Sequence, residues 1–390
     1  MISSIVVGAG GRATWAIPTL HQSGDFKLAA VVDLVPAKAQ ALLDHYGISD
    51  VPVYADLTEC LRLCRPQAVV VCTPDGCHAD VAVPALNAGC FVFLEKPLEV
   101  TRERCQAIIE ADDAAGHRAF VGHNLRFAPM YRKIQSLLRD GAVGPVLTLE
   151  ANAHYVGGRT YFRRWNRLQR MGGGLWITKS CHDLDILYWL AGKRPLAIAA
   201  FDDLTHYRPR ADAPLHCRDC REKQTCPDAY PKDYAADFVQ LAEVVERATG
   251  QRSDLCLWNS DKDTCDHGMA IVQFEGGAIA TLTLNVVATD DQRHIKICGP
   301  AGRIEGDLED QRIHYRKRYA DADEIIEATD QTQGGHGGAD LHILGAFADL
   351  IKRQPSMYIS PREAAVSVLM GLAARQSSAE HRVVEVDLIE

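Results

Sequence analysis

The sequence predicts an α/β fold that begins with a doubly wound parallel sheet, and three observations lead to this class. Apolar segments such as 68–72 alternate with amphipathic segments throughout residues 1–122. The stretch GAGGRA at 8–13 closes the first apolar segment, and Asp33 closes the second. Near-continuous apolar strands between amphipathic helices indicate a parallel sheet covered on both faces, with its ligand at the carboxyl ends of the strands.

The expected elements of this first domain follow one another in a regular order. Apolar and β-branched composition predicts strands at 3–10, 26–33, 66–74, 90–97 and 117–124. Amphipathic spacing predicts helices at 11–23, 36–47, 56–64, 77–89 and 101–116. We therefore expect a first domain over residues 1–122.

The remaining residues, 123–390, are expected to form a second domain. Strands are predicted at 145–155, 195–203, 267–277, 278–288 and 294–302, and closing helices at 337–354 and 361–378. The period of two in 278–286 is typical of an antiparallel sheet with one covered face.

Composition excludes several classes of function. A net charge of −9 without a basic stripe disfavours nucleic-acid binding. The apolar runs are much shorter than a membrane span, and the first residues lack the basic flank and cleavage site of a signal peptide. We expect a cytoplasmic protein with no membrane or nucleic-acid partner, whose 13 cysteines are not a disulfide framework.

The glycine-rich turn predicts a dinucleotide site. Glycines allow a tight turn and close backbone approach, and the following helix offers free N–H groups to a pyrophosphate. The residues of this turn expected to bind cofactor are Gly8, Gly10, Gly11, Arg12 and Ala13. Asp33 follows at about the expected ~20 residues, where an acid accepts from ribose hydroxyls and repels a 2′-phosphate. The pattern favours NAD over NADP; the alternative is a glycine turn of another α/β protein.

Two further strand ends fall on the same edge of the predicted sheet. One carries Thr73, Pro74 and His78, and the next carries Glu95 and Lys96 before Pro97. We expect Thr73, Pro74, His78, Glu95 and Lys96 to contact the cofactor. Lys96 would hold a substrate hydroxyl and the nicotinamide ribose, with Glu95 orienting it. A surface ion pair of little energy is the alternative.

These motifs, taken with a later stretch, carry a family resemblance. GAGGRA, Asp33, CTP, EKP and GGGLWITKSCHDLDILYWLAG together resemble the glucose–fructose oxidoreductase / inositol dehydrogenase (Gfo/Idh/MocA) family. The resemblance implies an N-terminal Rossmann domain and a C-terminal α+β domain with a large, mostly antiparallel sheet that often forms the interface of a dimer or tetramer. It also implies that Lys96 belongs to the active site and that the substrate is a sugar, cyclitol or related polyol.

The family pattern has an acid four residues before a helix-opening histidine, and this sequence departs from it. The histidine is His182, but the position of the acid is Thr178, and Lys179 lies between them. Histidine suits a general base, because its unperturbed pKa is near ~6.5. We therefore expect His182 as the base, Lys96 as the donor to the reacting oxygen, and Lys179 as a second catalytic lysine that lowers neighbouring pKa values. Lys96 as the base, or a His182 that merely packs, are the alternatives.

Substrate-binding candidates surround these residues. Each of them lies at the expected domain junction, in a loop rich in arginine and aromatic residues, or at a position that the family pattern includes. They are Asn124, Arg126, Tyr155, Arg159, Arg164, Trp165, Asp185 and His336. Aromatic faces stack on sugar rings and arginines pair with anions, so that a sugar acid or sulfonated sugar would fit. There are two alternatives. Arg126 clamps the two domains together, or the arginine and aromatic residues of the loop form a solvent-exposed face that binds no ligand.

A polar insertion near 206–255 contains closely spaced thiols. Cys217, Cys220 and Cys226 follow one another, and Cys256 comes soon after. The C-x2-C spacing is typical of tetrahedral zinc sites. A closed structural zinc site and a set of free thiols both remain open.

Three functions compete at this point. The first is an NAD-dependent dehydrogenase of a sugar or cyclitol hydroxyl. The second is a redox-assisted glycoside hydrolase that oxidises C3 transiently, eliminates the aglycone, adds water and reduces C3 again. The third is a non-catalytic regulator that binds NAD and a sugar, which the presence of both Lys96 and His182 disfavours.

Overall fold

The first domain is a parallel sheet with helices on both faces. The computed structural model describes residues 1–232, 236–328 and 339–390. Its six-stranded parallel sheet has the order β3-β2-β1-β4-β5-β6. The strands are β1 (Ile2–Val7), β2 (Phe26–Val32), β3 (Val53–Tyr54), β4 (Ala68–Val71), β5 (Phe91–Leu94) and β6 (Ala119–Val121). The predicted α/β class is confirmed, and β3 is a short strand that the sequence pattern did not indicate.

Five helices connect these strands. They are α1 (Ala13–Gln22), α2 (Pro36–His45), α3 (Leu57–Cys64), α4 (His78–Asn87) and α5 (Arg102–Ala115). Side chains that accept from backbone N–H groups begin two of them, Asp56 at α3 and Thr101 at α5. All four residues of β4 are fully buried, which explains its unbroken apolar sequence. The carboxyl ends of β1, β4 and β5 thus form one rim.

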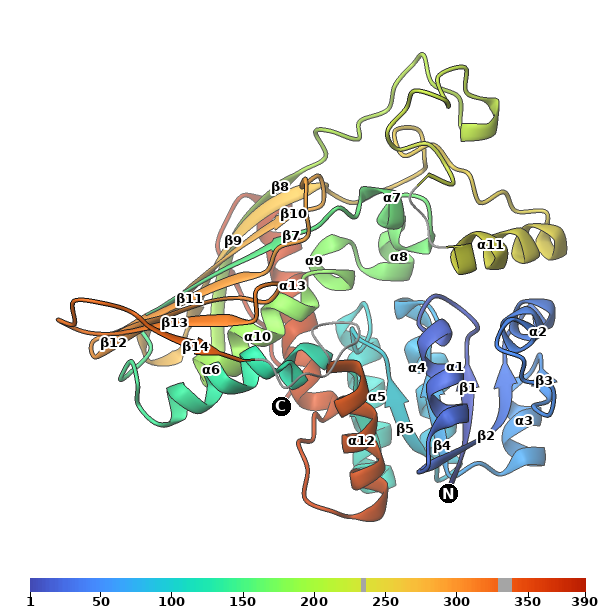
Figure 1. Ribbon diagram of the computed structural model, residues 1–390, viewed down its shortest axis with the longest axis horizontal. Helices are drawn as coiled ribbons and strands as arrows, with labels where there is room; N and C mark the ends of the chain where they lie inside the picture. Colours follow the sequence, from blue (N-terminus) through green and yellow to red (C-terminus); the bar gives the residue numbers. More distant parts are fainter. Residues whose placement is uncertain (233–235, 329–338) are drawn as a thin grey trace.

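The second domain contains a nine-stranded sheet of order β14-β13-β12-β11-β7-β10-β9-β8-β15 (Figure 1). Neighbouring strands are antiparallel except for β7 and β10, which are parallel. The strands are β7 (Thr148–His154), β8 (Pro195–Asp203), β9 (His267–Phe274), β10 (Ile279–Asn285), β11 (His294–Gly299), β12 (Gly302–Asp307), β13 (Arg312–Lys317), β14 (Glu324–Glu327) and β15 (Val384–Glu385). The predicted, mostly antiparallel sheet is confirmed.

Helices cover one face of this sheet. The long ones are α6 (Pro129–Arg139), α10 (Cys181–Ala191) and α13 (Pro361–Glu380), whereas α12 (Ala339–Lys352) packs against the first domain, where its Phe347 contacts Phe93 and Phe120. Ser377 and Ser378 of α13 accept from the N–H groups of Ala200 and Asp202 in β8, each at 2.9 Å. The same helix also packs against α5 of the first domain. It therefore joins the two domains.

The other face of the sheet carries exposed apolar side chains. Burial alternates along β9, and its outward positions include Met269 and Ile271, which are 59% and 53% exposed. Phe201 of β8 and Ile279 of β10 are exposed on neighbouring strands. None of the helices in the described ranges combines the length and the hydropathy that a membrane span requires.

The remaining elements are mostly short helices and turns. They are the helices α7 (Gly158–Tyr161), α8 (Gln169–Gly172), α9 (Leu175–Thr178) and α11 (Ala236–Thr249), and the 3₁₀ turns η1 (Asp75–Cys77), η2 (Asn124–Phe127), η3 (Trp165–Arg167), η4 (Cys217–Asp219) and η5 (Glu275–Gly277). Helix α11 belongs to the predicted cysteine insertion. It reaches over the first domain and packs against α2 (Figure 1).

Candidate active site

A cavity of about 1520 Å³ lies between the rim of the parallel sheet and the second domain. Both domains contribute to its walls. The predicted site residues that line it are Gly8, Gly10, Gly11, Arg12, Asp33, Thr73, Pro74, Glu95, Lys96, Asn124, Tyr155, Arg164, Trp165, Lys179 and His182. Most of the residues chosen from the sequence therefore meet at one place, although they come from distant segments.

The glycine turn presents unpaired backbone donors to this cavity. Gly8 has a φ of +92°, and a Cβ there would lie 2.8 Å from the carbonyl carbon of Cys72, so only glycine fits. Within the described residues, the N–H groups of Gly10, Gly11 and Arg12 donate no backbone hydrogen bond. These donors stand at the N-terminus of α1, where an anion is stabilised. The turn fits a pyrophosphate.

Asp33 lies at the end of β2 with its carboxylate fixed by the backbone. Its Oδ2 accepts from the N–H of Ala9 at 2.7 Å, and its Oδ1 accepts from that of Val35 at 2.8 Å. Lys38 Nζ is 3.6 Å away. An ionised carboxylate has about four acceptor sites, so two remain for ribose hydroxyls. The residues present therefore fit NAD. Ala13 is buried outside the cavity, where its N–H closes the turn onto Gly10.

Glu95 pairs with an arginine rather than with the adjacent lysine. Its Oε1 accepts from Nε of Arg12 at 2.7 Å, and Arg12 also lies 3.3 Å from Asp340 of α12. Asn124 donates to the same Asp340 at 2.8 Å. The expectation that Glu95 orients Lys96 therefore has no support in the geometry. This network neutralises Arg12 and fixes the edge of the cavity.

Lys96 is held by the backbone of the second domain. Its Nζ donates to the carbonyl oxygen of Thr178 at 3.0 Å. The Thr178 hydroxyl accepts from Nδ2 of Asn166 at 3.1 Å. Asp75 of η1 lines the cavity nearby, and burial raises the pKa of its carboxyl group to about 8, against the opposing charge of Lys96. Sequence reasoning missed Asp75, although it directly follows Thr73 and Pro74 at a strand end.

His182 lies in the first turn of α10, 4% exposed, and lines the cavity. The glycines before it serve a turn rather than a ligand. Gly173 has a φ of +74°, and a Cβ there would lie 2.8 Å from the side chain of Ile177. The three glycines at 172–174 do not line the cavity. These glycines allow α8 and α9 to pack tightly.

Lys179 is buried beside the histidine. It is 5% exposed, and its Nζ lies 3.8 Å from the centre of the Tyr155 ring. Burial, followed by the charge of Arg293, lowers the pKa of Lys179 to about 7. Near neutral pH this amine is thus present in both the neutral and the charged form, as a proton-transfer group requires.

Arg293 is a site residue that no sequence motif indicated. It precedes β11, lines the cavity, and its Nε lies 3.1 Å from Oδ1 of Asp183 in α10. No fixed spacing links position 293 to the histidine segment, so only the fold could reveal this neighbour.

Three predicted ligands lie outside the cavity in pairs with other protein groups. Arg126 is 2% exposed, and its Nε and Nη2 donate to both oxygens of Asp185, at 2.8 and 2.7 Å. Its Nη1 also donates to Glu363 of α13. Arg159 lies 3.8 Å from Asp228. Arg126 thus clamps η2 onto α10 and α13 within the second domain, which favours a structural role over substrate binding but does not support a clamp between the two domains.

Two further candidates cannot be placed at the cavity. His78 is fully buried, and its Nδ1 lies 2.9 Å from the carbonyl oxygen of Pro97, so it supports the loop after Lys96 rather than lining the site. His336 lies outside the described residues.

The cysteine insertion covers the glycine turn. A Cβ on Gly11 would lie 2.8 Å from Nη2 of Arg164 and 3.2 Å from the ring of Phe238 in α11. The neighbouring Arg163 is tied into the insertion, because its side chain donates to the carbonyl oxygens of Leu255 at 2.7 Å and Asp228 at 2.5 Å. The position of Arg164 above the turn therefore depends on the insertion.

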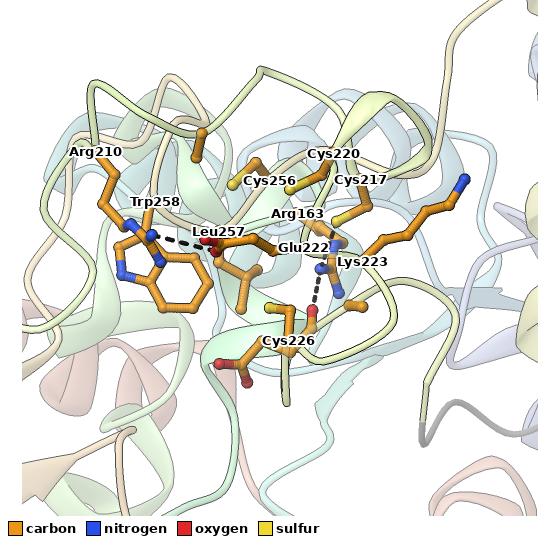
Figure 2. Close-up of a pocket in the computed structure, with 13 residues that line it drawn as sticks. Arg163, Arg210, Cys217, Cys220, Glu222, Lys223, Cys226, Cys256, Leu257 and Trp258 are labelled. Carbon is orange, nitrogen blue, oxygen red and sulfur yellow. Dashed lines mark hydrogen bonds and ion pairs between the residues drawn. The ribbon is translucent and has the colours of Figure 1, made fainter.

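The four thiols themselves surround a small cavity of about 20 Å³ (Figure 2). Nη2 of Arg163 donates to Sγ of Cys217 at 3.4 Å. Within the described part of the chain, no three of the sulfurs of Cys217, Cys220, Cys226 and Cys256 lie within 4.8 Å of one another. The geometry does not support the expected zinc site.

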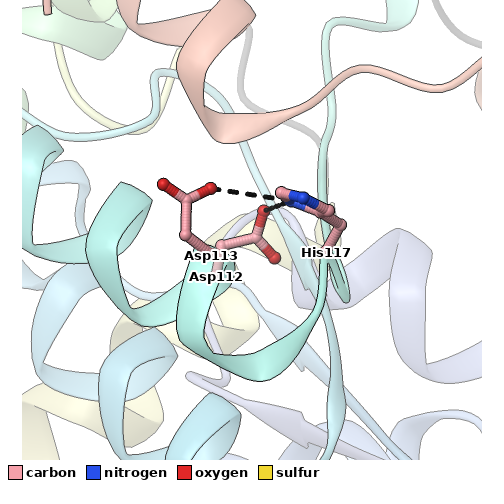
Figure 3. Close-up of side chains that lie close together, drawn as sticks. All are labelled: Asp112, Asp113 and His117. Carbon is pink, nitrogen blue, oxygen red and sulfur yellow. Dashed lines mark ion pairs between the residues drawn. The ribbon is translucent and has the colours of Figure 1, made fainter. Parts of the chain in front are cut away.

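One other group of side chains has a ligand-like arrangement. Asp112, Asp113 and His117 lie together at the end of α5 (Figure 3), and His117 Nδ1 is 3.7 and 3.6 Å from the two carboxylates. Asp112 accepts from the N–H groups of Arg118 and Ala119 at 2.8 and 2.7 Å. The cluster thus connects α5 to β6, and the other two side chains are exposed.

Comparison with known proteins identifies the family. Residues 2–123 match the model described as the oxidoreductase family, NAD-binding Rossmann fold, and residues 135–386 match its C-terminal alpha/beta domain. The chain is 27% identical over 352 residues to the putative oxidoreductase YteT of Bacillus subtilis, covering 83% of this chain and 82% of that protein. It is 28% identical over 202 residues to inositol 2-dehydrogenase of Rhizobium meliloti, covering 50% of this chain and 56% of that enzyme.

Solved structures share the same fold. The levoglucosan dehydrogenase complex with NADH and levoglucosan has a TM-score of 0.76 at 16% identity, covering 99% of each chain. The WlbA dehydrogenase from Bordetella pertussis, in complex with NADH and UDP-GlcNAcA, has a TM-score of 0.72 at 18% identity, covering 100% of this chain and 99% of that one. With both domains matched, the chain belongs to the NAD-binding Gfo/Idh/MocA family of oxidoreductases.

Proposed function

We propose that this protein is a dehydrogenase that transfers hydride between a hydroxyl-bearing carbon of a sugar, sugar derivative or cyclitol and NAD. The observation that carries the proposal is one cavity lined by the glycine turn, Asp33, Lys96, Lys179 and His182. The names of the related inositol 2-dehydrogenases and of the levoglucosan dehydrogenase point to the same class of substrate.

The first domain provides the groups that would hold the cofactor. Asp33 would accept from the ribose hydroxyls, and the free N–H groups at Gly10 and Gly11 would bind the pyrophosphate. Thr73, Pro74 and Lys96 line the same rim further along. Bound there, NAD would supply the hydride acceptor for oxidation and the hydride donor for reduction.

Residues of both domains provide the proton chemistry. His182 removes the hydroxyl proton as hydride leaves the carbon. Lys96, fixed by Thr178, donates a hydrogen bond to the reacting oxygen and stabilises its developing negative charge. Lys179 lines the same cavity, and its lowered pKa suits a group that gives and takes up a proton there.

The test is a panel assay on the purified protein. NAD is mixed with sugars, sugar derivatives and cyclitols, and NADH is followed by its absorbance. Steady NADH formation with at least one compound is expected. NADH formation with none of them, together with a failure to bind NAD in calorimetry, would refute the proposal. Tight NAD binding without turnover would favour the regulator instead.

A redox-assisted glycoside hydrolase is the second candidate, and the pair of Lys179 and His182 favours it. Oxidation at C3 acidifies the C2 proton, whose removal breaks the C1–oxygen bond and releases the aglycone. Water then adds across C1 and C2, and return of the hydride and a proton at C3 restores the alcohol. This sequence needs a second proton carrier, and Lys179 could serve. Release of aglycone from a chromogenic glycoside without net NADH would support this function over the first.

The open face of the large sheet suits a homo-oligomer. Phe201, Met269 and Ile271 are exposed on adjacent strands, and such apolar patches mark protein interfaces. We expect a dimer or tetramer formed through this face, as the family resemblance implies.

A further inference from the structure

We infer that the carbohydrate substrate carries a compact oxyanion, a carboxylate, phosphate or sulfonate, which Arg293 and Lys179 bind. This inference rests on the proposed function and names its substrate class more narrowly.

Arg293 offers donors that the protein does not use. Its Nε lies 3.1 Å from Asp183, and its side chain is 13% exposed. Within the described residues neither of its Nη atoms has a hydrogen-bond partner, although the residue lines the cavity. Donors that line a cavity without a protein partner are available to a ligand, and a guanidinium binds an oxyanion with two parallel hydrogen bonds. The cavity side of Arg293 thus matches an anionic group of the ligand.

Lys179 adds a second cation to the same wall. No acceptor among the described residues receives a hydrogen bond from its Nζ, which instead stacks on the ring of Tyr155. The positive charges of Arg293 and Lys96 act on this amine and lower its pKa. A neutral sugar would leave the part of this positive charge that Asp183 and Asp291 do not balance without a counter-ion.

Acidic neighbours balance this charge only in part. Asp183 is already paired with Arg293, and Asp291 accepts from the N–H of Val156 at 2.8 Å. Burial raises the pKa of Asp75 to about 8, so this carboxyl group is mostly neutral at pH 7. Three cations, Arg293, Lys179 and Lys96, then face two carboxylates, Asp183 and Asp291, so the local charge is positive while Lys179 is protonated.

The cofactor does not account for the subsite. Its pyrophosphate is expected at the free N–H groups that open α1 in the first domain. Arg293 and Lys179 belong to the second domain and adjoin the start of α10, where His182 stands. Moreover, Arg12 beside the turn is already neutralised by Glu95 and Asp340.

Binding of an anion here should be linked to proton uptake. In the free protein, the pKa of Lys179 is about 7, lowered by burial and by Arg293 and Lys96, and raised by Asp183 and Asp291. An anion in contact raises this pKa, so the bound state holds more protons. Affinity for an anionic sugar should then fall as pH rises above about 7, whereas that for a neutral sugar should not.

The experiment measures binding by calorimetry in the presence of NADH. The probes are D-glucose, D-glucuronate, glucose-6-phosphate and the sulfonate analogue of glucose, which separate the three anions. At least one anionic sugar should bind roughly tenfold more tightly than glucose, and Arg293→Lys should remove about tenfold of its affinity while leaving that for glucose unchanged. Arg312→Lys, in an exposed pair with Glu327, is the matched control and should change neither.

Equal affinity for glucose and all three anions, or an anion preference unchanged in Arg293→Lys, would overturn the inference. If that variant does not fold, the pH series on the unaltered protein decides: an affinity for the anion that stays constant between pH 6 and about 8 also overturns it. NADH formation from neutral sugars alone would refute the anion subsite and leave the dehydrogenase intact. Anion binding that depends on Arg293, without turnover of any sugar, would support the anion subsite and refute the dehydrogenase.

Discussion

Lys96 reaches across the domain junction and donates a hydrogen bond to the backbone carbonyl oxygen of Thr178 at 3.0 Å. Thr178 stands where the family resemblance implies an acid. Because the bond goes to the backbone, the ammonium group is fixed whatever side chain this position carries. The site therefore keeps a placed lysine without the usual carboxylate, and Asp75 of the first domain is an acid of the cavity wall on which the charge of Lys96 acts.

Replacement of this lysine should stop the chemistry while preserving the cofactor site. Lys96→Met removes the donor to the reacting oxygen, and loss of such a donor lowers kcat by roughly 10²–10³-fold. NAD affinity should change much less, because Asp33 and the glycine turn remain. Lys193→Met, at an exposed position, is the matched control. Full turnover of Lys96→Met with the preferred substrate would remove this residue from the mechanism.

The pH dependence should show which group acts as the base. A base must be deprotonated, so kcat/KM for oxidation falls as pH drops below its pKa. If Lys179 is the base, the limb lies near its lowered pKa of about 7 and disappears in Lys179→Met together with most of the activity. If His182 is the base, the limb persists in Lys179→Met and is lost in His182→Gln. Profiles of both variants distinguish the roles that the sequence left open.

The same lysine should reduce stability at low pH. Burial lowers its pKa in the folded state from 10.5 to about 7, so the unfolded chain binds more protons between these values. Stability should therefore rise with pH through this window, and the penalty is complete below about 7. Lys179→Met removes the penalty, and its free energy of unfolding in urea should be higher and less dependent on pH. A lower free energy in the variant would contradict the assignment.

The clamp formed by Arg126 should stabilise the fold rather than bind substrate. Arg126→Met leaves the buried Asp185 without its main partner, which costs roughly 3–5 kcal/mol. Urea unfolding measures this loss, and Arg312→Met should cost less than about 1 kcal/mol, because its pair is exposed. An increase in KM with unchanged stability would instead make Arg126 a substrate ligand.

Local sequence patterns were sufficient to predict the segments whose conformation depends mainly on their own residues. The fully buried β4 and the turn at Gly8 follow from composition and from a backbone conformation that only glycine adopts readily. Strands β12 to β14 were not predicted, because they carry many charged residues and form through pairing with β11 and one another. Pairing of this kind depends on partners rather than on intrinsic preference.

The residues of the candidate site also fall into two groups, those that a sequence motif indicated and those that only the fold revealed. Lys96 and His182 stand in recognisable stretches, so the sequence indicated them. Arg293 has no motif, and Phe238 lies in an insertion whose helix α11 the sequence did not suggest, so both became apparent only once the fold brought them to the cavity. His78 shows the opposite error, because its place after a strand end suggested a ligand while its ring is buried against Pro97.

The exposed apolar face should determine the oligomeric state. Met269 and Ile271 lie on the open side of strand β9, with Phe201 of the neighbouring strand β8 beside them. Replacing both β9 residues by lysine puts charges into the expected interface and should convert the oligomer to monomers in light scattering. Ile325→Lys, on the distant edge strand β14, is the control and should leave the assembly unchanged. A monomeric parent protein would refute the expectation.

Helix α11 should slow the release of the cofactor. The Phe238 ring and Arg164 stand over Gly11, so a dinucleotide bound along the turn would lie under a cover supplied by the cysteine insertion. Loss of an aromatic contact costs about 1 kcal/mol, so Phe238→Ala should speed NADH dissociation in stopped-flow fluorescence by roughly fivefold. Gln240→Ala, two residues along the same helix and exposed, should have no effect. Equal dissociation rates in Phe238→Ala and the parent protein would show that α11 does not retain the cofactor, whatever reaction the site performs.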